Sequence, residues 1–90
     1  MTISIAIIAA ALREEDVEGL IASGAPSDEY SLEAEKIASA LTALDGNRLN
    51  AATVVAVISF VWAKAFNRSP EEIKERIPAF QVIAQKLLAA

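Results

Sequence analysis

Apolar residues in this chain recur at intervals of three and four positions, which is the period of an amphipathic α-helix. One such stripe consists of Tyr30, Ala34, Ile37, Leu41 and Leu44. A second, beyond residue 70, consists of Ile73, Ile77, Phe80, Ala84 and Leu87. Residues 3–13 begin with a strand-like alternation, but their alanine content and the lack of a partner strand favour a helix there too.

Residues 49–63 differ from these stripes because they hold no charged side chain and are apolar on every side of a helix. A helix of that kind is either buried in a protein core or spans a membrane. Its length of about 22 Å falls short of the ~30 Å hydrocarbon core of a bilayer. We therefore expect a central helix, enclosed by the amphipathic segments on either side, and no membrane span.

The breaks in the front half predict where helices begin and end. Asp16 is expected to N-cap a short helix at residues 17–22, although the first helix bending at 14–16 is an equal alternative. Gly24 suits a left-handed position after it, and Pro26 prevents the helix from resuming. Residues 24–30 then form a loop. The candidate N-caps of the next helix are Ser27, Asp28 and Ser31.

The rear half carries stronger boundary signals. Asp45 and Gly46 are expected to end the helix whose apolar stripe begins at Tyr30, with Gly46 in the left-handed conformation. The candidate caps of the central helix are Asn47 and Asn50. Ser69 precedes a proline and stands three residues before Glu72, which predicts a capping box at the start of the last helix. The apolar register continues past Pro78, so we expect one kinked helix there.

Together these elements predict an all-α fold. We expect a compact bundle of four main helices, with a short helix or turn near residues 17–22, and a single domain over residues 1–90. The loops are short, and neither a repeat nor a linker is evident. Hydrophobic residues make up 54% of the chain, more than a domain of this size easily buries. The excess makes self-association a plausible use of the surface.

Cysteine and histidine are both absent from the sequence. Disulfides, thiolate chemistry and imidazole-based mechanisms are therefore excluded, and we expect no structural zinc. The apolar start of the chain lacks a basic region and is followed by Arg-Glu-Glu-Asp rather than a cleavage site, so we expect it to be part of the folded domain. The expected location is the cytoplasm.

Charge is distributed unevenly. Residues 1–45 hold two basic and nine acidic side chains, a net charge of −7, whereas residues 46–90 hold six basic and three acidic side chains, a net charge of +3. A pI near 4.7 argues against a nucleic-acid binder. The acidic front half instead favours a basic protein partner.

Two groups of acidic residues are candidates for chemistry. The first comprises Glu14, Glu15, Asp16 and Glu18, and the second comprises Asp28, Glu29 and Glu33, beside Tyr30. Carboxylates can bind divalent cations, but the first group lacks the spacing of a calcium loop. Carboxylates are also common near helix N-termini, where they complement the helix dipole. No base activates a serine and no Gly-rich phosphate loop is present, so we expect no enzyme, no cofactor and no metal site. The single Tyr30 and Trp62 are expected in the core, with the Tyr30 hydroxyl reaching the surface or a backbone group.

Residues 19–41, GLIASGAPSDEYSLEAEKIASAL, resemble a group of small uncharacterised bacterial all-helical proteins. Their pattern is W-D-P-x-G-L-I-x-x-G-A-P-x-D-E-Y-x-x-E. The matching positions here are Asp16, Gly19, Leu20, Ile21, Gly24, Ala25, Pro26, Asp28, Glu29, Tyr30 and Glu33. Glu15 replaces the tryptophan and Val17 the proline of the pattern, so the turn at 14–18 can differ. The resemblance implies a short all-α domain of unknown function, and some of these proteins resemble immunity proteins of bacterial toxin systems.

Three functional hypotheses follow. The first is a non-enzymatic protein-interaction module, of immunity type, that binds a basic partner through Asp28, Glu29, Tyr30 and Glu33. The second is a homo-oligomeric accessory or structural subunit whose excess apolar surface is its own interface. The third and least favoured is a metal-dependent enzyme that uses the carboxylates of the second acidic group. The loop at 24–30 serves either packing or recognition, since loops on rigid scaffolds often carry binding residues.

Overall fold

The computed structural model describes residues 3–26, 28–44 and 46–90. Its helices are α1 (Ile5–Glu15), α2 (Ser31–Thr42), the 3-10 turn η1 (Gly46–Arg48), α3 (Ala51–Ala65) and α4 (Pro70–Ala89). No strand occurs in these three ranges. The predicted all-α bundle of four main helices is therefore confirmed. Its radius of gyration, 12.2 Å, agrees with the roughly 12 Å of a compact domain of this length.

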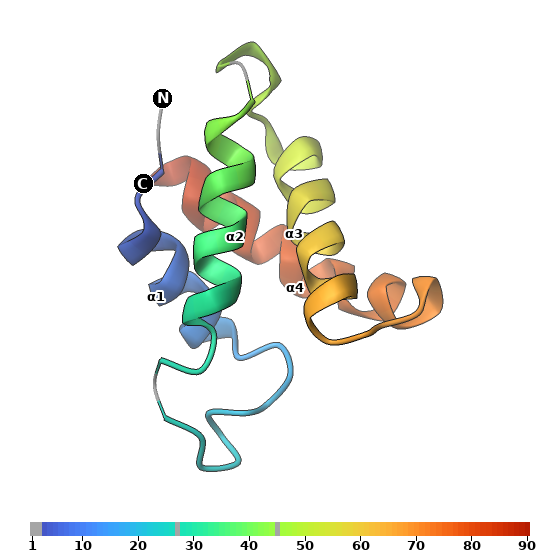
Figure 1. The fold of residues 1–90 in the computed structure, drawn as a ribbon. Coiled ribbons are helices and arrows are strands. Elements are labelled where there is room, and N and C mark those ends of the chain that lie inside the picture. Colours follow the sequence, from blue (N-terminus) through green and yellow to red (C-terminus); the bar gives the residue numbers. More distant parts are fainter. Residues whose placement is uncertain (1–2, 27, 45) are drawn as a thin grey trace.

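The four helices form a closed ring around one core. Each helix packs against its neighbours in sequence, and α1 closes the ring against α4. Figure 1 shows α2 and α3 side by side, with α4 passing behind them and α1 beside the C-terminal part of α4. Every helix therefore turns one side to the core and the opposite side to the outside.

Three helices begin at side-chain caps. The Ser4 hydroxyl accepts a hydrogen bond from the backbone N–H of Ile7 at 3.2 Å, which caps α1. Asn50 and Thr53 form a capping box at the start of α3. The predicted capping box of Ser69 and Glu72 is present at the start of α4. The N–H of each residue donates a hydrogen bond to the side chain of the other. The last helix continues through Pro78, as its apolar register indicated.

The ends of α2 differ from the sequence expectation. Neither Asp28 nor Ser31 acts as the N-cap, because Tyr30 holds that position and makes no side-chain cap bond. The helix ends at Thr42, whose hydroxyl donates to the Ala38 carbonyl at 2.8 Å. Gly46 begins the turn η1 instead of occupying a left-handed position after the helix. The remaining candidates at these boundaries, Ser27 and Asp45, lie outside the described residues.

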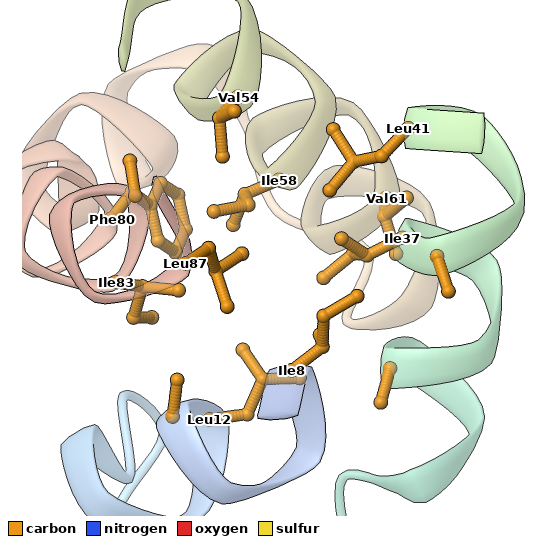
Figure 2. Close-up of a cluster of buried hydrophobic side chains, with 14 of the residues drawn as sticks. Ile8, Leu12, Ile37, Leu41, Val54, Ile58, Val61, Phe80, Ile83 and Leu87 are labelled. Carbon is orange, nitrogen blue, oxygen red and sulfur yellow. The ribbon is translucent and has the colours of Figure 1, made fainter. Parts of the chain in front are cut away.

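The core is assembled from one face of each helix. Figure 2 shows these side chains converging from four ribbons on a common centre. Among the residues that contribute are Ile8, Leu12, Ile37, Leu41, Val54, Ile58, Phe80, Ile83 and Leu87. Four of the five positions of the stripe that begins at Tyr30 are buried, and Leu44 is half-buried. The predicted apolar stripes of α2 and α4 therefore do face the core.

Helix α3 is buried on one side only, which corrects the expectation that residues 49–63 are enclosed all round. Its buried residues are Val54, Ile58, Val61 and Trp62. Phe60, on the opposite side, is 62% exposed. The ring arrangement explains the difference, because only α2 and α4 pack closely against α3 and both contact its inward side.

Candidate functional site

The segment between α1 and α2 contains most of the residues that the sequence singled out. Residues 17–24 form turns rather than a helix, so the turn alternative is the correct one. Asp16 is not the N-cap of a helix at 17–22; it ends α1, with a φ of 44°, and its N–H donates to the Leu12 carbonyl. Aspartate tolerates this left-handed conformation better than most residues. Gly24 has a φ of 105°, as expected for a glycine in that turn.

The Asp16 carboxylate organises this segment. Its Oδ2 accepts from the N–H of Ala22 at 2.9 Å, and its Oδ1 accepts from the N–H of Ile21 at 3.1 Å. The Tyr30 hydroxyl also donates to Oδ1, at 2.6 Å. The hydrogen bond from Tyr30 lowers the pKa of Asp16, the backbone bonds act in the same direction, and burial opposes them. One carboxylate thus closes the chain between residues 16 and 30 into a compact loop.

The Tyr30 hydroxyl has a second contact, because it accepts a hydrogen bond from the Glu18 N–H at 3.2 Å. Burial raises the pKa of Tyr30 to about 12, and the bond to Asp16 adds to the rise. The Tyr30 ring is 2% exposed and stacks on the ring of Trp62 at a centroid distance of 5.6 Å. The expected core ring is confirmed, and of the two expectations for the hydroxyl, the surface or a backbone group, the backbone group is correct.

The Glu18 carboxylate accepts hydrogen bonds from three other side chains, those of Trp62, Arg68 and Arg76. Its Oε2 accepts from Trp62 Nε1 at 2.7 Å and from Arg76 Nε at 2.6 Å. Its Oε1 accepts from Arg76 Nη2 at 3.2 Å and from Arg68 Nη2. The side chain is only 4% exposed. Burial is the largest single influence and opposes ionisation, but the bonds from Arg76, Trp62 and Arg68 together outweigh it and lower the pKa of Glu18 to about 2.

This Glu18 cluster, made of Glu18, Trp62, Arg68 and Arg76, was missed by the sequence expectations, which placed Glu18 in the first acidic group. One signal was available, because the N–H of a buried tryptophan usually has a hydrogen-bond acceptor. The sequence alone could not select Glu18 as that acceptor, because the two residues are 44 positions apart. The cluster ties the segment 16–30 to α3 and α4 at once.

The four predicted partner-binding residues do not share one surface. Asp28 and Glu29 are exposed, whereas Tyr30 is buried under the segment. Glu33 is 7% exposed, although it does not belong to the apolar stripe that begins at Tyr30. It precedes Ile37 by one helical turn, which places both on the core side. Burial raises the pKa of Glu33, and the nearby charge of Glu29 adds to the rise. The backbone N–H of Glu33 and the charge of Lys36 act in the opposite direction.

The carboxylates of the first acidic group have partners within the chain. Glu15 and Glu14 accept from Lys86 Nζ at 2.8 and 3.5 Å, while Asp16 and Glu18 bond as described above. Within the described ranges, no three acidic, histidine or cysteine side chains are grouped so that they could hold a metal ion. Three open surface hollows lie between pairs of helices, at α1–α2, α1–α4 and α3–α4.

Comparisons with protein-family models, with curated proteins and with solved structures each give no match to this chain. The resemblance of residues 19–41 to small bacterial helical proteins therefore stays a prediction. Among the helices described, none combines the length and the apolar character needed to cross a membrane.

Proposed function

We propose that this protein is a non-enzymatic protein-interaction module that binds a basic protein surface through the exposed side of the segment between α1 and α2. The observation that carries the proposal is the contrast between the base and the tip of that segment. Asp16 and Glu18 hold the base in place through several hydrogen bonds. Asp28 and Glu29, which lie directly before Tyr30 and which we call the tip, are exposed and form no ion pair with any residue in the described ranges.

The pairing of charges supports this choice of surface. Glu14 and Glu15 are paired with Lys86, and Glu18 is paired with Arg68 and Arg76. Three acidic side chains of the front half are therefore paired within the molecule, whereas the charges of Asp28 and Glu29 have no such pairing among the described residues and can meet a partner. Complementary charge of this kind accelerates association and selects among partners.

The partner surface that fits has basic side chains around an apolar spot. Leu32, which follows the tip on the first turn of α2, is 57% exposed and supplies the apolar contact. In this proposal Asp28 and Glu29 contact the partner, and Tyr30 positions the segment from beneath. A cytoplasmic, immunity-type role is the form of the proposal that the resemblance of residues 19–41 favours.

The experiment compares three baits in affinity capture from the native host, quantified by mass spectrometry. The baits are the wild type, an Asp28→Asn/Glu29→Gln variant, and a Glu71→Gln/Glu75→Gln variant with the same charge change at exposed positions of α4. We expect a basic protein that is retained by the first and third baits and lost by the second.

Association kinetics with that protein then test the mechanism. Steering by exposed charge weakens between ~0.1 M and ~1 M salt, because the Debye length falls from ~10 Å to ~3 Å. The wild-type association rate should fall over this range, and the rate of the tip variant should already be low. A partner whose association rate ignores both salt and the tip variant would overturn the proposal.

A further inference from the structure

Glu33 is a nearly covered carboxylate without an ion-pair partner among the described residues. It stands on the first turn of α2 and is 7% exposed. The carboxylates that accept hydrogen bonds from other described residues are those of Glu14, Glu15, Asp16, Glu18 and Glu72. Ion pairs between described residues do not include Glu33 either. Acids this deeply buried are rarely left unpaired, so Glu33 calls for an explanation.

The comparison with Glu18 shows what Glu33 lacks. The two carboxylates are covered to a similar extent, since the Glu18 side chain is 4% exposed. Burial opposes the ionisation of both. In Glu18 the bonds from Arg76, Trp62 and Arg68 outweigh burial and the pKa falls to about 2, whereas the pKa of Glu33 rises. Within the described ranges the chain thus supplies two cations to Glu18 and pairs none with Glu33.

The Glu33 carboxylate is directed toward the tip. Glu33 follows Glu29 by four residues, or one helical turn, so the two side chains stand on the same side of the start of α2. The charge of Glu29 raises the pKa of Glu33, an effect that nearby charges exert over about 4–6 Å. Arg68 Nε is the single buried side-chain N or O atom without a partner in the described ranges. The unpaired oxygen of Glu33 therefore still reaches solvent, beside Glu29.

We propose that Glu33 is the specificity-determining residue of the surface around the tip, and that it forms an ion pair with an arginine side chain of the partner. This inference rests on the function proposed above and names the contact that selects the partner. The planar guanidinium can bond to both oxygens of a carboxylate. It is also more weakly hydrated than an ammonium group, so it loses less on entering a nearly covered position.

The three carboxylates then have different roles. Asp28 and Glu29 are exposed, and their charges act mainly on the rate of association. Glu33 has little contact with water, so its charge gains more from a partner's cation than an exposed charge does. In the free protein the same unpaired charge opposes folding. Glu33→Gln should therefore stabilise the free chain and weaken binding, whereas a residue that serves packing alone would not change the two in opposite directions.

The test is an NMR titration of the ¹⁵N-labelled chain at pH 7 with the capped peptide acetyl-Gly-Arg-Gly-amide at constant ionic strength. The amide signals of Glu29 and Glu33 should shift until saturation. We expect a dissociation constant on the order of 10 mM, because one charged pair carries the binding. A peptide with citrulline in place of arginine has the same shape without the charge and should cause no shift. A peptide with lysine in that place should bind more weakly than the arginine peptide.

Variants locate the contact on α2. Glu33→Gln should raise the dissociation constant of the arginine peptide at least about fivefold, as loss of one member of a covered charge pair does. The matched control is Glu35→Gln, which makes the same change at an exposed position two residues further on and should leave binding unchanged. Circular dichroism checks that both variants keep their helix content. Unchanged binding by Glu33→Gln, equal binding of the citrulline peptide, or a lysine peptide that binds as tightly would each overturn the proposal.

Affinity capture with Glu33→Gln as a fourth bait separates this inference from the proposed function. We expect the basic protein to be lost by this bait, as it is by the tip variant. A basic protein that the tip variant loses and Glu33→Gln retains would overturn the role of Glu33 and leave the proposed function standing. If the arginine peptide binds at Glu33 and no basic protein is captured by the wild type, the proposed function fails and the arginine site stands.

Discussion

Arg76 donates a hydrogen bond from Nε to Oε2 of Glu18 at 2.6 Å, and the two residues are 58 positions apart in the chain. Arg76 stands on the second turn of α4, and Glu18 lies in the segment that follows α1. Trp62 on α3 donates to the same oxygen. A single buried carboxylate therefore connects three parts of the ring, and the segment that carries the proposed binding tip depends on it for its position.

Glu18→Gln should destabilise the protein by about 2 kcal/mol. The amide keeps the size of the side chain but loses the negative charge that pairs with Arg76 and Arg68. A hydrogen bond to a charged group contributes about 1.5–3 kcal/mol to stability. The two arginines are partly exposed, which places the expected loss below the ~3–5 kcal/mol of a fully buried pair. The measurement is urea unfolding at neutral pH.

Glu15→Gln is the control for that substitution. It removes an ion pair with Lys86 that is more exposed than the Glu18 pair, and exposed pairs contribute little. The loss should be clearly smaller than for Glu18→Gln. Equal losses would mean that the Glu18 cluster does not hold the fold together.

Acid should weaken the wild type through the same carboxylate. Because the folded state lowers the pKa of Glu18 from 4.5 to about 2, the protein binds fewer protons folded than unfolded between these values. The stabilising contribution is complete above about pH 4.5 and decreases as the pH falls toward 2. The lowered pKa values of Asp16 and Glu72 act in the same direction. Urea midpoints at pH 7, 4 and 2.5 should fall for the wild type and fall less for Glu18→Gln.

Glu33→Gln should stabilise the protein at neutral pH. Burial raises the folded-state pKa of Glu33, so its contribution is present below the ordinary value of 4.5 and is lost as the pH rises through the folded value. A neutral amide removes the need to bury a charge, and we expect a gain of about 0.5–2 kcal/mol, as single stabilising substitutions commonly give. Exposed Glu35 provides the control, since Glu35→Gln should change thermal stability little. A melting temperature of Glu33→Gln below that of the wild type would contradict the prediction.

Tyr30→Phe should loosen the segment without disturbing the core. The ring that stacks on Trp62 is retained, but the Glu18 N–H loses its acceptor and Asp16 loses its hydroxyl donor. We expect a loss of about 1–2 kcal/mol, typical of an unsatisfied part-buried group. Hydrogen exchange should accelerate at the amides of Ile21 and Ala22, which bond to Asp16, and remain unchanged at Ile58. Uniform acceleration across the chain would indicate global destabilisation instead.

Two residues of α3 provide a direct test of which side faces the core. Ile58 is fully buried, and Ile58→Ala should cost about 2–5 kcal/mol. Phe60→Ala removes a larger side chain two positions further on, yet its effect on unfolding of the single chain should stay within about 0.5 kcal/mol, because the ring is exposed. Urea melts at low micromolar concentration distinguish the two. A larger loss for Phe60→Ala would mean that the outward side of α3 is packed.

The sequence by itself determined the four helices and the start of the last one, and it narrowed the start of α3 to two candidate caps. Apolar residues spaced by three and four positions select one face of a helix wherever it packs, so Ile37, Leu41, Phe80 and Leu87 were assigned correctly to the core. The box of Ser69 and Glu72 closes within three residues and depends on nothing outside them. Local signals weaken where caps compete, as at the ends of α2.

Only the tertiary structure decided which charges are paired and which face of α3 is open. Glu18 meets Arg76 across 58 positions, and no local spacing specifies such a contact. A helix that is apolar on every side has no period to indicate its inward face, so the orientation of α3 came from α2 and α4 packing against Ile58 and leaving Phe60 outside. Glu33 lies on the core side of α2 because it is one helical turn before the buried Ile37. In each case the sequence specifies the chemistry of the side chain, and the packing of distant helices decides what surrounds it.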